Sequence, residues 1–138
     1  MKLSGYSGTP LPQKLGLKPG QRVHFVNAPP EFAKLLGPSP DDVEVVERPT
    51  KPLDFVVIFV TSAVELTEKL PKLITALTPA GMIWVSWPKK ASGVPTDLTE
   101  NVIRDIALAA GVVDVKVCAI SEIWSGLKLV IRLKDRKT

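Results

Sequence analysis

Two adjacent lysines, Lys89 and Lys90, stand in a short loop whose residue types could bind an anion. The loop follows a predicted strand and precedes a predicted helix, and ligands of open parallel sheets bind outside the carboxyl ends of strands. Ammonium groups, hydroxyls and the free N–H groups of a helix N-terminus are anion ligands at such a place. We therefore expect residues 87–97 to form a binding surface, with these candidates: Trp87, Lys89, Lys90, Ser92, Thr96 and Asp97. The alternative is a solvated loop whose lysines bind nothing specific.

Three further residues are candidates for the same edge of the sheet. Ser62 directly follows a strongly apolar strand, and Glu65 stands three residues later, which is the spacing of a helix capping box. Trp124 and Ser125 lie between the last two predicted strands and can approach this edge. The opposing expectation for Trp124, and for Trp87, is packing in the core or in the hairpin.

Ordinary catalytic and metal-binding sets are missing from the sequence. Cys118 is the single cysteine and His24 the single histidine, and each lies within an apolar strand pattern. A nucleophile needs a base that activates it, and a structural metal site normally takes several His or Cys ligands. We therefore expect both residues to be structural, and we expect neither a metal nor a cofactor.

Charge and hydropathy narrow the class of protein. The chain has 18 basic and 14 acidic residues, and +3 of its net charge of +4 lies in residues 132–137. A nucleic-acid interface needs a basic face with stacking aromatics or a groove-reading element, so nucleic-acid binding is disfavoured. No apolar run has the length of a membrane span, and the first residues have no apolar signal core. We expect a cytoplasmic protein without membrane contact, while the oligomeric state stays open.

The elements that must position the candidates alternate between strands and helices. Strands are expected at 22–27, 43–47, 53–60, 82–87, 112–120 and 127–133. Helical segments are expected at 12–15, at 31–36, from Ser62 onwards and after Asp97, which is expected to cap the last helix. Pro71 should kink or split the third helix, residues 78–81 should form a turn, and the stripe of the last helix should be Leu98, Val102, Ile106 and Ala110.

This pattern predicts one three-layer α/β domain of about six strands, with an N-terminal arm at 1–19, the domain at 20–133 and a basic tail at 134–138. The sheet should be mostly parallel, in the order 2-1-3-4-6-5 with the sixth strand reversed. The strand at 53–60 should be central, because it is nearly all apolar rather than alternating.

The layout resembles the class I methyltransferase fold, shortened by one strand–helix unit. The turn and strand LTPAGMIWVSWP and the ending GVVDVKVCAISEIWSGLKLVIR carry this resemblance. The chain is also similar to a family of small bacterial proteins known as domain of unknown function 3052, through residues 4–16, 26–29, 59–62, 84–100 and 113–132.

The methyltransferase resemblance implies a glycine-rich turn after the first strand and an acid after the second. Glu47 occupies the place of the acid that contacts ribose hydroxyls in that family. The first strand, however, ends in Asn27-Ala28-Pro29-Pro30, without a glycine, and the prolines add bulk where the cofactor would lie. Asn27 and Glu47 are therefore ligand-binding candidates, but tight binding of S-adenosylmethionine is not expected.

The leading hypothesis is a non-catalytic binding module on a degenerate methyltransferase-like scaffold, which binds a small anionic ligand or a protein partner. One alternative is an enzyme, either a residual methyltransferase or a nucleotide-using activity with Lys89 or Lys90 on a phosphate. Another is a structural subunit that acts in assembly. Fold analogy alone does not choose among them.

Overall fold

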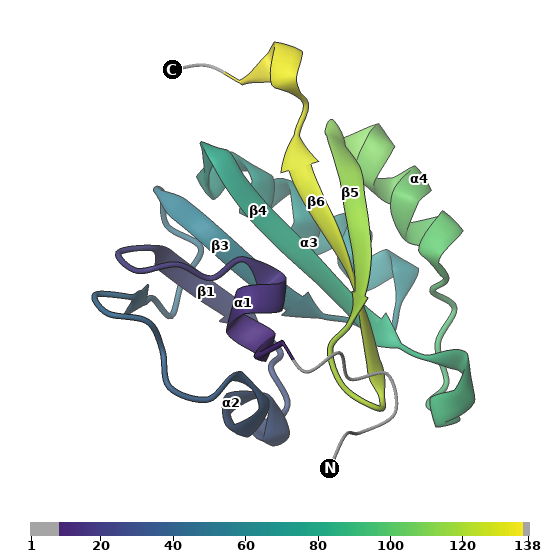
Figure 1. The fold of residues 1–138 in the computed structure, drawn as a ribbon. Helices are drawn as coiled ribbons and strands as arrows, with labels where there is room; N and C mark the ends of the chain where they lie inside the picture. Colours follow the sequence, from purple (N-terminus) through teal and green to yellow (C-terminus); the bar gives the residue numbers. More distant parts are fainter. Residues whose placement is uncertain (1–8, 137–138) are drawn as a thin grey trace.

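The computed structural model describes residues 9–136, which form a single sheet flanked by helices (Figure 1). The strands are β1 (Arg22–Val26), β2 (Glu44–Val45), β3 (Leu53–Phe59), β4 (Leu77–Pro88), β5 (Val112–Ala119) and β6 (Trp124–Ile131). The α-helices are α1 (Leu11–Leu15), α2 (Pro30–Leu36), α3 (Ala63–Ala76) and α4 (Glu100–Ala110), with short 3₁₀ turns at Lys90–Ser92 and Leu133–Asp135. Parts of the expected arm and tail, at 1–8 and 137–138, lie outside the described residues.

The strand order is β2-β1-β3-β4-β6-β5, so the predicted topology is confirmed. Strands β1 to β4 pair in parallel, whereas β6 runs antiparallel to both of its neighbours. Six of the seven residues of β3 are buried, as expected for a strand covered on both faces.

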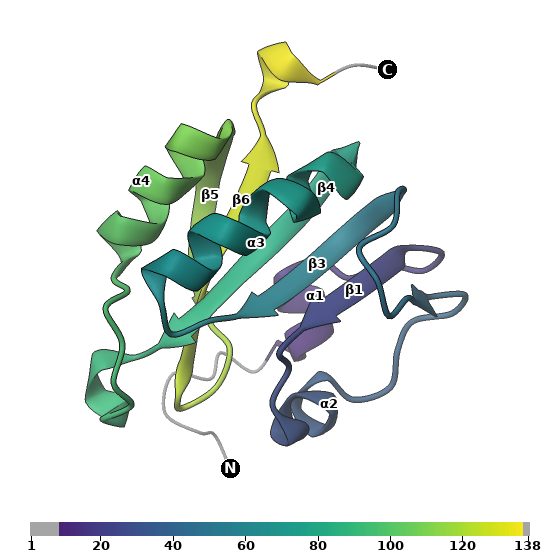
Figure 2. The ribbon, with the colours of Figure 1, turned by 180° about the vertical axis from the view of Figure 1, so that it is seen from behind.

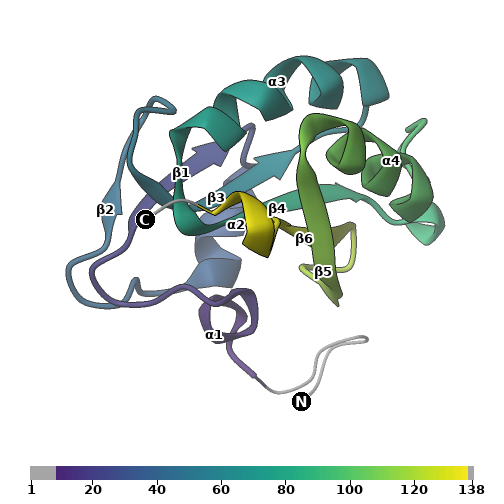
Figure 3. The same cartoon turned by 90° about the horizontal axis from the view of Figure 1, so that it is seen from above.

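Helices cover the two faces of the sheet unequally (Figures 2 and 3). On one face α3 and α4 pack over β3, β4 and β6, with Leu66, Leu70 and Ile103 buried against Ile83 and Leu127. On the other face α1 and α2 pack over β1, β3 and β4, around a second buried cluster that includes Leu15, Phe32 and Trp84. Among the described helices, none is long and apolar enough to cross a membrane.

Helix α1 is too short to be stable alone, and contacts with the sheet hold it. The indole Nε1 of the fully buried Trp84 donates a hydrogen bond to the Leu15 carbonyl at 2.8 Å. The ammonium of Lys14 donates to the Ala119 carbonyl at 3.1 Å. Both bonds join residues that are far apart in the sequence, so the expected arm is packed into the domain from Leu11 onwards.

Helix α3 begins as predicted and continues through Pro71. The Ser62 hydroxyl accepts from the Glu65 N–H, which is one half of the expected capping box. The helix runs unsplit from Ala63 to Ala76 with Pro71 inside it, so the predicted split does not occur, while the alternative of a kink stays a prediction. Buried Leu66, Leu70 and Leu73 lie on both sides of the proline and keep the helix docked on the sheet.

The expected turn at 78–81 belongs to β4. The register shifts from Leu53 opposite Leu77 to Phe55 opposite Met82, so the extra residues bulge out of the ladder. A Cβ on Gly81 would come within 2.9 Å of the Leu53 carbonyl oxygen, which explains why a glycine stands at this bulge. The predicted turn is therefore not formed, and an irregularity within β4 stands in its place.

One expectation for α4 was wrong, and a second was confirmed only in part. Its N-cap is Thr99, whose hydroxyl accepts from the Val102 N–H at 3.2 Å, rather than Asp97. The centre of its buried stripe is Ile103 and Ala107, while the predicted members Val102, Ile106 and Ala110 are only partly buried. The predicted Leu98 is buried, and the other three predicted members pack against the same core cluster, so they border the stripe rather than form its centre.

The final hairpin is longer on its second strand than expected. Strand β6 already begins at Trp124, which pairs with Pro88, so Trp124 and Ser125 are strand residues rather than a connection. The connection is residues 120–123, where the Ser121 hydroxyl accepts from the Ile123 and Trp124 N–H groups.

The His24 imidazole is buried and its Nδ1 lies 2.9 Å from the Val46 carbonyl, as expected for a sheet residue.

Candidate functional site

The crevice between the carboxyl ends of β1 and β3 is where an open sheet of this order would bind a ligand. The chain reverses direction across the sheet there, and such switch points hold the ligand in other α/β proteins. In this protein the Asn27 side chain crosses the crevice, because its Nδ2 donates to the Phe59 carbonyl at 3.1 Å and to the Glu65 carboxylate at 3.0 Å. Asn27 adopts the left-handed φ of 58°, which points to a position fixed by these contacts. The switch point is therefore bridged by the protein itself.

The N-terminus of α2, next to the same crevice, offers few donors to an anion. Pro29 is the N-cap residue and Pro30 the first helical residue, and neither has a backbone N–H. The Phe32 N–H is already bonded to the Pro29 carbonyl. A second hollow of about 390 Å³ lies beside this helix, and its lining contains no charged residue.

Most polar groups of residues 87–97 hold the loop in place. The Ser92 hydroxyl donates to the Lys89 carbonyl, and the Thr96 hydroxyl donates to the Thr61 carbonyl, both at 2.6 Å. The Asp97 carboxylate accepts from the Ala63 N–H at 2.8 Å, so it caps α3 rather than α4. Of the charged side chains of this loop, those of Lys89 and Lys90 have no hydrogen bond or ion pair among the described residues, whereas Asp97 is bonded.

The other sequence candidates do not join the two lysines in one site. Trp87 is buried in the core cluster under α3 and α4, while Trp124 is half-buried on the opposite face and stacks edge-on against Phe59. Glu47 is exposed after β2, on the far side of β1 from the loop. Ser125 pairs with Trp87 across β4 and β6. The structure thus spreads the candidates along the carboxyl edge.

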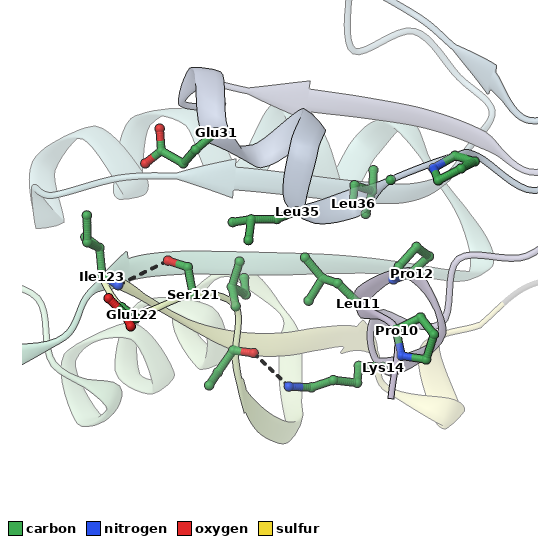
Figure 4. Close-up of a pocket in the computed structure, with 14 residues that line it drawn as sticks. Pro10, Leu11, Pro12, Lys14, Glu31, Leu35, Leu36, Ser121, Glu122 and Ile123 are labelled. Atoms are coloured by element: carbon green, nitrogen blue, oxygen red, sulfur yellow. Dashed lines mark hydrogen bonds between the residues drawn. The ribbon is translucent and has the colours of Figure 1, made fainter. Parts of the chain in front are cut away.

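A cavity of about 640 Å³ that the sequence did not predict also lies at this edge (Figure 4). Three segments enclose it: the start of α1, the length of α2 with the turn after it, and the β5–β6 connection. Its volume falls in the range of roughly 300–1,000 Å³ that is usual for small-molecule sites. Its apolar lining includes Leu11, Leu35, Leu36, Ile120 and Ile123.

A few polar groups stand at the ends of the cavity. Figure 4 shows Glu31 of α2 on the same side as Glu122 and Ile123 of the β5–β6 connection, with Lys14 at the opposite end. Neither Glu31 nor Glu122 has an ion pair among residues 9–136, and both are exposed. The Lys14 ammonium is turned to the Ala119 carbonyl. The arrangement is an apolar chamber with two free carboxylates at one end.

Known catalytic groupings are lacking within the described part of the chain. No three His, Cys, Asp or Glu side chains gather closely enough to hold a metal ion there. The half-buried Cys118 has no neighbouring base, and burial raises the pKa of its thiol, while the charges of Lys14 and Lys116 oppose that rise.

Sequence reasoning missed the cavity because its walls come from three separate segments. Leu35 and Ile123 are large apolar residues that stay partly exposed, at 37% and 38%, but exposure is not visible in the sequence. The one usable signal was the arm, in which Leu11 and Leu15 are spaced to face the same side of a helical turn. That signal points to docking of the arm, not to a chamber under it.

Comparison with known proteins agrees with this architecture. A protein-family model described as "Protein of unknown function (DUF3052)" matches residues 41–133. The chain belongs to this family. None of the curated proteins matches the chain.

Solved structures similar to this DUF3052 protein share its fold at low identity. A SAM-dependent methyltransferase from Aquifex aeolicus has a TM-score of 0.58 at 18% identity, over 87% of both chains. Magnesium protoporphyrin IX methyltransferase from Synechocystis PCC 6803, with bound SAH, has a TM-score of 0.60 at 11% identity, over 88% of this chain and 78% of the other. Fibrillarin from Aeropyrum pernix, with natively bound S-adenosyl-L-methionine, scores 0.58 at 11% identity over 91% and 70%. The DUF3052 protein therefore has a methyltransferase-like fold.

Proposed function

We propose that this DUF3052 protein is a binding module without a catalytic step of its own, and that its ligand enters the cavity between α1, α2 and the β5–β6 connection. The observation that carries the proposal is the cavity itself, an apolar chamber of about 640 Å³ with few polar groups. Such chambers, with a small number of placed polar groups, are the usual form of small-molecule sites. The loop at 87–97 is the weaker site, because its hydroxyls and Asp97 serve internal bonds.

The polar groups around the cavity suit recognition better than chemistry. The Ser121 hydroxyl has no neighbouring base and accepts two backbone N–H groups, so it forms the turn rather than a nucleophile. Lys14 donates to a carbonyl that fixes the position of α1. Glu31 and Glu122 are exposed to solvent at the mouth.

The balance of charge sets the class of ligand. Two carboxylates without ion pairs stand at one end of the cavity, and apolar walls fill the rest. A ligand with an apolar body and one basic group would bury the body against Leu35 and Ile120 and place the cation between Glu31 and Glu122. An anionic ligand would have to rely on Lys14 alone, and it would meet two like charges at the mouth.

S-adenosylmethionine, which the fibrillarin from Aeropyrum pernix holds, fits this chain poorly. The N-terminus of α2 has lost two N–H groups to Pro29 and Pro30. Asn27 fills the crevice between β1 and β3 through its bonds to Phe59 and Glu65. Residual methyl transfer is therefore the second candidate, favoured only by the fold, and the experiment below includes it.

A thermal-shift panel on matched variants tests the proposal. The panel holds aryl-alkyl amines, the corresponding carboxylates and S-adenosylmethionine. Leu35→Trp would fill the cavity from a partly exposed position, and Leu108→Trp makes the same change on α4, where Leu108 is 47% exposed and distant from the cavity. We expect the amines to raise the melting temperature of the native protein and of Leu108→Trp, but not of Leu35→Trp.

Two results would overturn the proposal. One is stabilisation by the amines that survives in Leu35→Trp, which would place their site elsewhere. The other is stronger stabilisation by S-adenosylmethionine than by every amine, which would favour methyl transfer as the function. If the carboxylates bind and the amines do not, the cavity stands but the assigned role of Glu31 and Glu122 is wrong.

A further inference from the structure

One face of the β5–β6 hairpin has no helix over it among the described residues. Helices α1 and α2 cover β1, β3 and β4 on that side, whereas β6 and β5 stand open beside α1 (Figures 1 and 3). Sheets of this doubly wound type are normally covered on both faces. The open face is therefore the place where the three-layer architecture is incomplete.

The side chains of this open face follow from the strand register. Leu127 and Leu129 of β6 point into the core under α3 and α4, so Lys128 and Val130 point to the other side. Lys128 pairs with Lys116 of β5, and Val130 pairs with Val113. We call these four residues, with Lys18 at their border, the basic sheet face.

Lys18 borders this face because α1 ends over β4, next to β6. The Trp84 indole bonds to the Leu15 carbonyl, and Trp84 pairs with Lys128 across β4 and β6. A Cβ on Gly16 would touch the Met82 side chain, whose residue pairs with Val130. Lys18 follows two residues after Gly16, so three lysines converge from the segment after α1, from β5 and from β6.

No carboxylate neutralises these lysines in the described part of the chain. The nearest acid of β5, Asp114, faces the opposite side and pairs with Arg104 of α4 at 3.1 Å. Burial lowers the pKa of Lys128, and the positive charges of Lys116 and Lys18 lower it further. Like charges opposite each other in a sheet are unfavourable, so the repulsion among these lysines lowers the free energy of unfolding. No contact among the described residues compensates for it.

We propose that the basic sheet face docks an acidic amphipathic helix of a partner protein. A helix with side chains is about 10 Å across. Two neighbouring strands, each taking up about 4.8 Å of the sheet, form a surface of similar width. Val113 and Val130 provide an apolar row for its buried stripe, and the lysines provide partners for its acids. This surface is separate from the cavity, so the proposal is independent of the proposed function.

The chemistry of the face favours protein over nucleic acid. Its cations are all lysines, which lack the guanidinium group that binds a phosphate through two hydrogen bonds. Its aromatic neighbour, Trp84, is fully buried and cannot stack on a base. A second copy of this chain is also disfavoured, because two such faces would repel each other.

Selection from a helix-display library tests the proposal without a known partner. The library presents helical peptides with all residue types at their surface positions, and it is selected against the native full chain. Lys18→Glu/Lys116→Glu reverses two of the lysines at exposed positions. Lys89→Glu/Lys90→Glu changes the net charge equally at the carboxyl edge, where Lys89 stands five residues after Trp84, the partner of Lys128, or about 17 Å away at about 3.4 Å per residue.

We expect the enriched peptides to carry acids and aliphatic residues on one helical face. Their affinity should fall by about tenfold or more in Lys18→Glu/Lys116→Glu and remain within about twofold in Lys89→Glu/Lys90→Glu, with strong weakening by salt. Thermal melts of both variants show whether each remains folded. If Lys18→Glu/Lys116→Glu unfolds, Lys116→Gln alone replaces it, and we expect a smaller loss of peptide affinity.

Several outcomes would overturn the proposal. Enriched peptides without excess acid, or acidic peptides that bind the reversed variant as well as the native chain, would show that the face recognises nothing of this kind. Duplex DNA or phosphatidylglycerol vesicles that bind the face more tightly than the peptides would assign it to phosphates. Dimerisation of the native chain that the Lys18→Glu/Lys116→Glu variant loses would assign it to a second copy.

Discussion

Replacing Trp84 by Phe should destabilise the protein by about 3 kcal/mol, because it removes both packing and a buried hydrogen bond. The Leu15 carbonyl loses its 2.8 Å bond to Nε1 and stays in the core. An unsatisfied buried acceptor costs about 1–3 kcal/mol. The indole is larger than the phenyl ring by roughly two methylene equivalents, at about 0.8 kcal/mol each. Urea unfolding followed by circular dichroism measures the sum.

Trp87→Phe is the matched control for this change. Trp87 is also buried in the core, but its indole N–H has no acceptor among the described residues. The excess loss in Trp84→Phe therefore reports the bond that anchors α1, and we expect it to be about 1–3 kcal/mol. Hydrogen exchange should also accelerate at the amides of Gly16 and Leu17, which close the helix. Equal destabilisation by both substitutions, with unchanged exchange at these amides, would refute this account of how the cavity wall is held.

Three further predictions concern single side chains. Ser86→Ala should raise the free energy of unfolding by about 1 kcal/mol, because its buried hydroxyl has no partner; denaturation that shows a loss instead would contradict this. Asp97→Ala should lower it by about 1 kcal/mol and Asp97→Asn by less, since Asn keeps an acceptor for the Ala63 N–H; equal losses in denaturation would contradict this. Lys116→Gln should raise the pKa of Cys118 further and slow its alkylation at mildly alkaline pH; an unchanged alkylation profile would contradict this.

The order of the sheet was predictable because each strand carried its own burial pattern. The apolar run of β3 required cover on both faces, and the short crossovers left few ways to arrange the strands. The hairpin at the end followed from two strand patterns joined by a short connection. These are local signals that the tertiary structure preserves.

The errors arose where several polar residues competed for one role. Asp97 and Thr99 both suit a helix cap, and the structure uses Thr99 for α4 and Asp97 for α3. That choice depends on the position of α3 beside the loop, which local sequence does not encode. The role of Asn27 as a ligand contact stays a prediction, and in the structure its side chain bonds to Phe59 and Glu65.

The candidate site was the least predictable part of the molecule. Its walls at Leu11, Leu35 and Ile120 belong to segments separated by long stretches of sequence, and one of these walls, α1, is held on the sheet by long-range hydrogen bonds from Trp84 and Lys14. Lysines in a loop are visible in a sequence, but a cavity is a property of packing. The prediction therefore favoured the loop.

Methyl-group NMR on the native chain tests the central claim most directly. The chain is titrated with an aryl-alkyl amine, and the shifts of the Leu and Ile methyl groups are followed. The account predicts that the largest changes fall on Leu11, Leu35, Ile120 and Ile123, which line the cavity. Changes that concentrate instead around Leu98, next to the 87–97 loop, or an absence of saturable changes at the cavity, would contradict it.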